Sequence, residues 1–90
     1  MGSWRFEITR EGQDDLARLD TASRNRILAK LKWFAENFDH LVPLALGVPW
    51  RGFFKLRVGD WRVVYEIEHE KRLVTVHVID RRNVVYKRRG

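Results

Sequence analysis

Apolar and polar residues alternate on both sides of Gly59-Asp60, through the segment FFKLRVGDWRVVYEI at positions 53–67. A Gly-Asp pair between two alternating runs is typical of a β-hairpin, because glycine readily adopts the positive φ that tight hairpin turns need. A two-residue turn places Arg57 opposite Arg62, and such like-charged pairs destabilise a sheet unless the face serves an anion. The alternation predicts an apolar face (Phe54, Leu56, Val58, Trp61, Val63, Tyr65 and Ile67) and a basic face (Phe53, Lys55, Arg57, Arg62, Val64 and Glu66).

The N-terminal half predicts one strand followed by two helices. Residues 4–9 alternate as in a half-buried strand. Thr9 can cap a helix that continues to about residue 19, and Asp20 or Thr21 can cap a longer helix that ends near residue 38. The two helices are expected to form an antiparallel hairpin, because only a residue or two separates them. The longer helix carries an apolar stripe of Ile27, Leu28, Leu31, Phe34, Ala35 and Phe38.

The C-terminal half predicts a loop and further strands around the hairpin. Residues 39–50 contain two prolines and predict a loop. Residues 73–79 alternate and predict a strand that pairs with the hairpin, and residues 84–86 predict a last short strand. This pairing places Val74, Val76 and Val78 opposite Ile67, Tyr65 and Val63 on the apolar face. It places Thr75, His77, Ile79 and Arg81 on the basic face.

These elements predict one α+β domain that spans residues 1–90. The expected order is β-α-α-β-β-β, with an optional final strand, and the helix hairpin packs on one face of a twisted, mainly antiparallel sheet. The other face of the sheet is expected to be partly open. It should bring together Lys55, Arg57, Arg62, His77 and Arg81.

Charge strengthens the case for an anionic partner. The formal net charge is +6 and the isoelectric point is about 10.3. Residues 1–50 carry seven basic and seven acidic side chains, whereas residues 51–90 carry eleven and five, so the whole excess lies in the C-terminal part. A one-sided excess of this kind indicates a polyanion such as nucleic acid. The chain has no cysteine and no apolar run near the ~20 residues of a membrane span, so we expect a cytoplasmic protein without a membrane partner.

The residue pattern excludes several kinds of chemistry. The glycines lack the spacing of phosphate-binding loops, and the three histidines lie in separate elements without metal-ligand spacing. We therefore expect neither a metal nor another cofactor. A cluster of cations can still assist RNA cleavage, because the 2′-hydroxyl beside each phosphate is a built-in nucleophile and cations stabilise charge on the phosphoryl oxygens. His77 alone on a strand is more often structural than catalytic.

Two segments resemble the RelE toxins of bacterial toxin–antitoxin systems, within the RelE/ParE superfamily. They are FKLRVGDWRVVYEI at 54–67 and VIDRRNVVY at 78–86, and the order of elements agrees over nearly the whole chain. The resemblance implies a RelE-like fold, similar to microbial ribonucleases. It also implies a ribosome-dependent endoribonuclease that cuts mRNA without a metal. The implied partners are the 70S ribosome, mRNA and an acidic antitoxin that holds the toxin inactive.

The resemblance also implies roles for individual residues. Lys55 matches a lysine that removes a proton or stabilises charge, and Arg62 matches the arginine on the scissile phosphate. Arg81 matches the arginine that protonates the leaving group, or Arg82 does if the loop has another register. Tyr86 matches a tyrosine that stacks on the message. Supporting contacts to RNA are expected from Arg57, Arg82, His77, Lys87 and Arg88.

One position departs from the family pattern, and two other functions stay open. Phe53 occupies the place of a second lysine, so any two-lysine base is in question. The first alternative is a ParE-like inhibitor of DNA gyrase, although the Arg-Arg-x-x-x-Tyr ending of residues 81–86 favours RelE. The second is an RNA-binding homologue without catalytic activity.

Overall fold

The computed structural model describes residues 3–47 and 50–88, with the side chain of Tyr86 outside the described part. It contains a five-stranded sheet with the order β1-β5-β4-β3-β2. β1 runs parallel to β5 and the other neighbouring strands are antiparallel, which confirms a mainly antiparallel α+β fold. None of the described helices is long and apolar enough to span a membrane.

The strands are β1 (Arg5–Ile8), β2 (Leu44–Ala45), β3 (Phe54–Val58), β4 (Trp61–Glu68) and β5 (Leu73–Arg81). The helices are α1 (Arg10–Ala17), α2 (Thr21–Glu36), the 3-10 turn η1 (Phe38–His40) and α3 (Arg82–Arg88).

The caps of the first two helices are those that the sequence predicts. The Thr9 hydroxyl accepts a hydrogen bond from the backbone N–H of Gly12 at 3.2 Å, and the Asp20 carboxylate accepts one from Ser23 at 3.2 Å. Each cap satisfies an N–H group that has no partner within its own helix. The chain can therefore reverse direction between α1 and α2 within a few residues.

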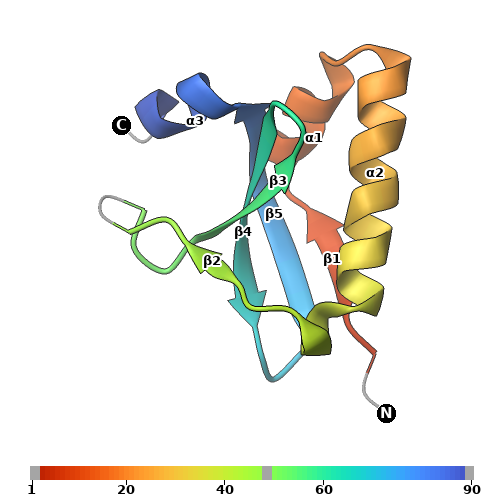
Figure 1. Ribbon diagram of the computed structural model, residues 1–90, viewed down its shortest axis with the longest axis vertical. Coiled ribbons are helices and arrows are strands. Elements are labelled where there is room, and N and C mark those ends of the chain that lie inside the picture. The colour runs from red at the N-terminus through yellow and green to blue at the C-terminus, as the bar shows by residue number, and fades with distance from the viewer. Residues whose placement is uncertain (1–2, 48–49, 89–90) are drawn as a thin grey trace.

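The helix hairpin covers one face of the sheet, and Figure 1 shows the long helix α2 alongside the strands. The predicted stripe of α2 faces this core, where Ile27 and Leu31 are fully buried and Phe34 is 4% exposed. The apolar face of the β3–β4 hairpin packs against the stripe, as predicted. The buried members of this main core are Leu16, Ile27, Leu31, Phe34, Phe38, Val58, Val63, Tyr65, Val74, Val76 and Ile79.

The β3–β4 hairpin has the predicted register. Val58 pairs with Trp61 and Arg57 pairs with Arg62 across a two-residue turn. Gly59, the first residue of that turn, has a φ of +60°, which a type II′ turn requires at this position. The register therefore places Arg57 and Arg62 side by side on the face away from the main core.

A β-bulge in β5 makes part of the predicted register wrong. Tyr65 pairs with Val76 but Val64 pairs with Val78, so His77 is an extra residue in β5. Beyond the bulge the side chains of β5 exchange faces. Ile79 enters the main core opposite Val63, whereas Val78 lies on the opposite face of the sheet.

The predicted last strand at residues 84–86 is wrong, because these residues belong to the helix α3. Val85 is 1% exposed and packs with Trp50, Val64 and Val78 in a second, smaller core on the face opposite α1 and α2. The expected open face is therefore partly covered. α3 and the segment around Trp50 leave only part of it accessible.

The predicted loop at residues 39–50 contains the short edge strand β2. Leu44 pairs with Lys55 and Ala45 with Phe54, so this segment extends the sheet beyond β3. Leu44 stays 46% exposed. β2 therefore forms a partly apolar rim beside the basic residues of β3.

Tyr65 is the largest fully buried side chain, and it lies at the centre of the main core. Its ring contacts Phe34 edge-on at 5.2 Å and stacks on Phe54 at 5.8 Å, measured between ring centroids. Its hydroxyl has no hydrogen-bond partner among the described residues. Burial raises the pKa of Tyr65 to about 12, because the ionised phenolate would lose its hydration.

We predict that Tyr65→Phe raises the free energy of unfolding at pH 7 by about 1 kcal/mol, because it removes a buried hydroxyl without a partner. The raised pKa also predicts an alkaline effect. The folded state holds the phenol proton more tightly than the unfolded state, so ionisation of Tyr65 costs no stability below the unfolded pKa, near 10. The free energy of unfolding falls as the pH rises from there toward about 12, and Tyr65→Phe should not show this fall. Urea unfolding at pH 7 and pH 11 measures both effects, and a loss of stability at pH 7 would show that the hydroxyl is hydrogen-bonded.

Candidate active site

Four cationic side chains line one pocket on the face of the sheet opposite α1 and α2. Lys55 and Arg57 come from β3, Arg62 comes from β4, and Arg82 is the first residue of α3. The pocket has a volume of about 230 Å³, and no acidic residue lines it among the described residues. We call it the basic pocket. It is a concave, positively charged site of a size suited to a phosphate group.

The backbone of the hairpin turn fixes Arg62. Its Nη1 donates to the carbonyl oxygens of Gly59 and Trp61, each at 2.9 Å. These bonds use Nη1 alone, and a guanidinium has three further N–H donors. Arg57 lies directly across the strand pair, so the turn and the register together bring two guanidinium groups to one place.

The bulge decides which of the two consecutive arginines reaches the basic pocket. Arg81 pairs with Trp61, and its guanidinium carbon lies 4.9 Å from the centre of the Trp61 ring. The expectation that Arg81 shares a surface with Lys55 and Arg57 is therefore wrong, because the extra residue at His77 reverses its face. Arg82 lines the pocket instead, and its backbone N–H donates to Asp60 at 3.1 Å.

His77 lies outside the basic pocket. Its Nε2 is 2.6 Å from Oε1 of Glu66, and its ring contacts Phe53 edge-on at 5.3 Å. It lines a separate cavity of about 240 Å³ with Trp50, Phe53 and other residues. His77 thus occupies the bulge and pairs with a carboxylate, which fits a structural role.

The remaining predicted residues lie on α3. Lys87 is exposed, and the backbone of Tyr86 is helical although its side chain lies outside the described part. Arg88 does not line the basic pocket, because three carboxylates bind its guanidinium. The described residues contain no group of acidic or histidine side chains that could bind a metal ion.

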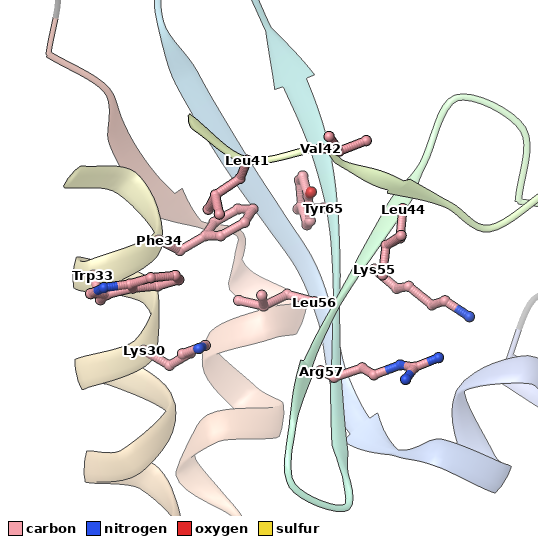
Figure 2. Close-up of a pocket in the computed structure, with 10 residues that line it drawn as sticks. All are labelled: Lys30, Trp33, Phe34, Leu41, Val42, Leu44, Lys55, Leu56, Arg57 and Tyr65. Carbon is pink, nitrogen blue, oxygen red and sulfur yellow. The ribbon is translucent and has the colours of Figure 1, made fainter. Parts of the chain in front are cut away.

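An apolar groove of about 220 Å³ adjoins the basic pocket, and the sequence did not predict it. Trp33 is 43% exposed and Val42 is 85% exposed, and both line this groove with Leu44. Figure 2 shows the charged ends of Lys55 and Arg57 pointing away from Trp33 and toward the C-terminal helix. These two residues line both the groove and the basic pocket. The groove is formed by Lys30, Trp33, Phe34, Leu41, Val42, Leu44, Lys55, Leu56, Arg57 and Tyr65.

One sequence signal could have indicated the groove. Trp33 lies outside the core stripe of α2, and Val42 and Leu44 are apolar residues in a proline-containing segment. Scattered apolar residues of this kind are common on protein surfaces. Only the fold shows that they come together, with a Lys30 ammonium 4.2 Å from the centre of the Trp33 ring.

The fold and the basic pocket together define a small α+β protein with a cationic site for an anion. Residues 6–85 match the model of the ParE toxin of the type II toxin–antitoxin system parDE. The chain therefore belongs to the ParE toxin family, within the RelE/ParE superfamily, and is a toxin of the type II class. No curated protein matches it by sequence.

Solved structures of RelE toxins share the fold. The chain is 21% identical to the RelBE2 toxin–antitoxin complex of Mycobacterium tuberculosis, over 90% of this chain and 100% of that chain, with a TM-score of 0.80. It is 20% identical to the isolated RelE toxin of E. coli, over 96% and 93% of the chains, with a TM-score of 0.70. It is 17% identical to YafQ of E. coli strain BL21(DE3), over 92% and 98%, with a TM-score of 0.61.

Proposed function

We propose that the protein is a metal-independent endoribonuclease that cuts mRNA on the ribosome and so stops translation. The basic pocket is the observation that carries this proposal. Four cations of β3, β4 and α3 converge there without a lining carboxylate among the described residues. Such a site favours a group that gains negative charge as it reacts, as the phosphate of RNA does. The proposal places the protein in the cytoplasm, where ribosomes are found.

The proposed reaction is a transesterification within the RNA. The 2′-oxygen attacks the neighbouring phosphorus, a bond from phosphorus to the 2′-oxygen forms, and the bond to the 5′-oxygen breaks. The 2′-hydroxyl loses its proton to a base, and the leaving 5′-oxygen gains a proton. The products are a 2′,3′-cyclic phosphate and a 5′-hydroxyl, so no water molecule is consumed.

We propose a separate role for each residue of the pocket. Arg62, which the turn carbonyls orient, and Arg82 would bind the phosphoryl oxygens and stabilise their growing charge. Lys55 is proposed to assist removal of the 2′ proton, and Arg57 to add positive charge. Tyr86, on the same helix as Arg82, is proposed to stack on a base.

A second candidate is inhibition of DNA gyrase, because the matching family model is that of a ParE toxin. In that case the cationic residues would bind a protein or DNA partner without chemistry. The two candidates differ in what accumulates after induction in cells. Cut messages indicate the ribonuclease, whereas accumulated gyrase–DNA cleavage complexes with uncut messages indicate the inhibitor.

The two consecutive arginines provide a matched test of the ribonuclease. We predict that Arg82→Ala lowers the rate of message cleavage by about 10²–10³-fold, as does Arg62→Ala, because each removes a donor to the charged transition state. Arg81→Ala should retain most of the activity, because its side chain contacts Trp61 outside the pocket. Growth arrest and primer extension on induced messages measure the effects. Equal activity in Arg82→Ala and the unchanged protein would contradict the assignment.

We also propose that the apolar groove binds the antitoxin. Exposed apolar side chains gathered in one groove are typical of a docking site. Lys30, Lys55 and Arg57 line the same groove, so its complement is an apolar segment with acidic neighbours. The RelBE2 toxin of Mycobacterium tuberculosis, which shares the fold, was solved in complex with its antitoxin. An acidic segment here would also engage the two cations that the groove shares with the basic pocket.

We predict that Trp33→Glu weakens antitoxin binding by at least roughly 30-fold, since a buried tryptophan anchor typically contributes about 2 kcal/mol or more. Toxicity without antitoxin should be unchanged, because Trp33 does not line the basic pocket. Titration calorimetry with the antitoxin and growth rescue by its co-expression measure the effect. Lys71→Glu is the control, since it adds acidic charge at an exposed position outside the groove. Full rescue of the Trp33 variant would contradict the groove assignment.

A further inference from the structure

Arg88, at the end of α3, binds three carboxylates, two from α1 and one from β5. Its Nη1 lies 2.8 Å from Asp15 of α1 and 3.0 Å from Asp80 of β5, and its Nη2 lies 2.8 Å from Glu11 of α1. We call Glu11, Asp15 and Asp80 the carboxylate cluster. Burial lowers the pKa of Arg88, but the hydrogen bonds that it donates to the cluster and the charge of Asp15 outweigh that effect and raise the pKa.

Asp15 is the buried member of the carboxylate cluster, and the fold holds its side chain in place. It is only 3% exposed, and it accepts a hydrogen bond from the backbone N–H of Ile79 at 2.9 Å. Arg18 contacts it from the exposed side at 3.3 Å. A buried carboxylate needs such partners, because it has lost its hydration. The contact with Arg88 therefore joins the C-terminal helix to α1 and β5 at a fixed point.

The same helix carries Arg82, which lines the basic pocket. The backbone N–H of Arg82 donates to Asp60 at the start of α3, Val85 packs in the second core, and Arg88 binds the carboxylate cluster at the end. α3 has only seven residues, and helices this short are not stable without tertiary contacts. The position of Arg82 therefore depends on these three contacts.

The two ends of α3 lie in opposite electrostatic surroundings. Repulsion opposes the observed position of Arg82, the first residue, whereas attraction favours that of Arg88, the last residue. Arg82 lies in one pocket with Lys55, Arg57 and Arg62, and like charges repel each other. Arg88 forms ion pairs with three carboxylates, in a partly buried setting where solvent screens little. The attraction at the end of the helix thus offsets the repulsion at its start.

We propose that Arg88 is a positioning residue, which binds the carboxylate cluster and thereby keeps Arg82 in the basic pocket. This inference rests on the proposed ribonuclease function. Arg88 itself touches no reacting atom, and its effect reaches the reaction only through Arg82. Its sequence neighbour Lys87 is exposed and has no comparable contacts among the described residues.

The test compares Arg88→Ala with Arg82→Ala and with the double variant, in hydrogen exchange and in ribosome-dependent message cleavage. In Arg88→Ala we expect the amides of residues 84–88 to exchange at least tenfold faster. We expect kcat to fall toward that of Arg82→Ala with a smaller change in KM. The double variant should be no slower than Arg82→Ala alone, because Arg88 acts through Arg82. Arg88→Lys, which keeps the charge, should restore part of both readouts.

Arg18→Ala is the matched control. It removes another arginine from Asp15 but does not touch α3, so exchange and cleavage should stay unchanged. The proposal is overturned if the loss of cleavage rate in the double variant equals the product of the losses in the two single variants. It is also overturned if the amides of residues 84–88 exchange at an unchanged rate in Arg88→Ala. If the unchanged protein cleaves no message, the proposed function fails. The exchange data then still decide whether Arg88 fixes α3, and circular dichroism shows whether each variant is folded.

Discussion

The register of the β3–β4 hairpin is the constraint on which the rest of the structure depends. A two-residue turn at Gly59 fixes Arg57 opposite Arg62, although like charges at this position are unfavourable. The hairpin tolerates the pair because its other face packs into the main core, where Val63 and Tyr65 are fully buried. Apolar burial thus stabilises a strand pair in which two arginines repel each other. An anion bound between them should reduce this repulsion.

The second core and the C-terminal helix complete the site. Val85 packs α3 on the sheet, which brings Arg82 to the two arginines of the hairpin, and Arg88 joins the far end of the helix to acidic residues of α1 and β5. Positive charge is therefore concentrated in one pocket, while the carboxylates of Glu11, Asp15 and Asp80 pair with Arg88. The apolar groove adjoins the basic pocket at Lys55 and Arg57, so a partner in the groove and an anion in the pocket would share these two residues.

Local patterns predict the hairpin, the helix caps and the core stripe of α2, because each depends on residues close together in the chain. The β-bulge at His77 could not be predicted, since nothing in an alternating run shows where one residue will be left unpaired. That residue decides between Arg81 and Arg82 in the pocket. Likewise, residues 84–86 have the composition of a strand but form a helix, because Val85 finds an apolar site against Trp50. The groove and the carboxylate cluster join distant segments, so only the fold shows them.

The central claim is that the basic pocket stabilises an RNA phosphate while the neighbouring 2′-hydroxyl attacks it. The most direct measurement uses ribosomes programmed with a message that carries a single 2′-deoxy nucleotide at a mapped cleavage position. We predict that cleavage at that position is abolished, whereas the all-ribose message is cut there and leaves a 2′,3′-cyclic phosphate. Continued cleavage at the 2′-deoxy position would contradict the account.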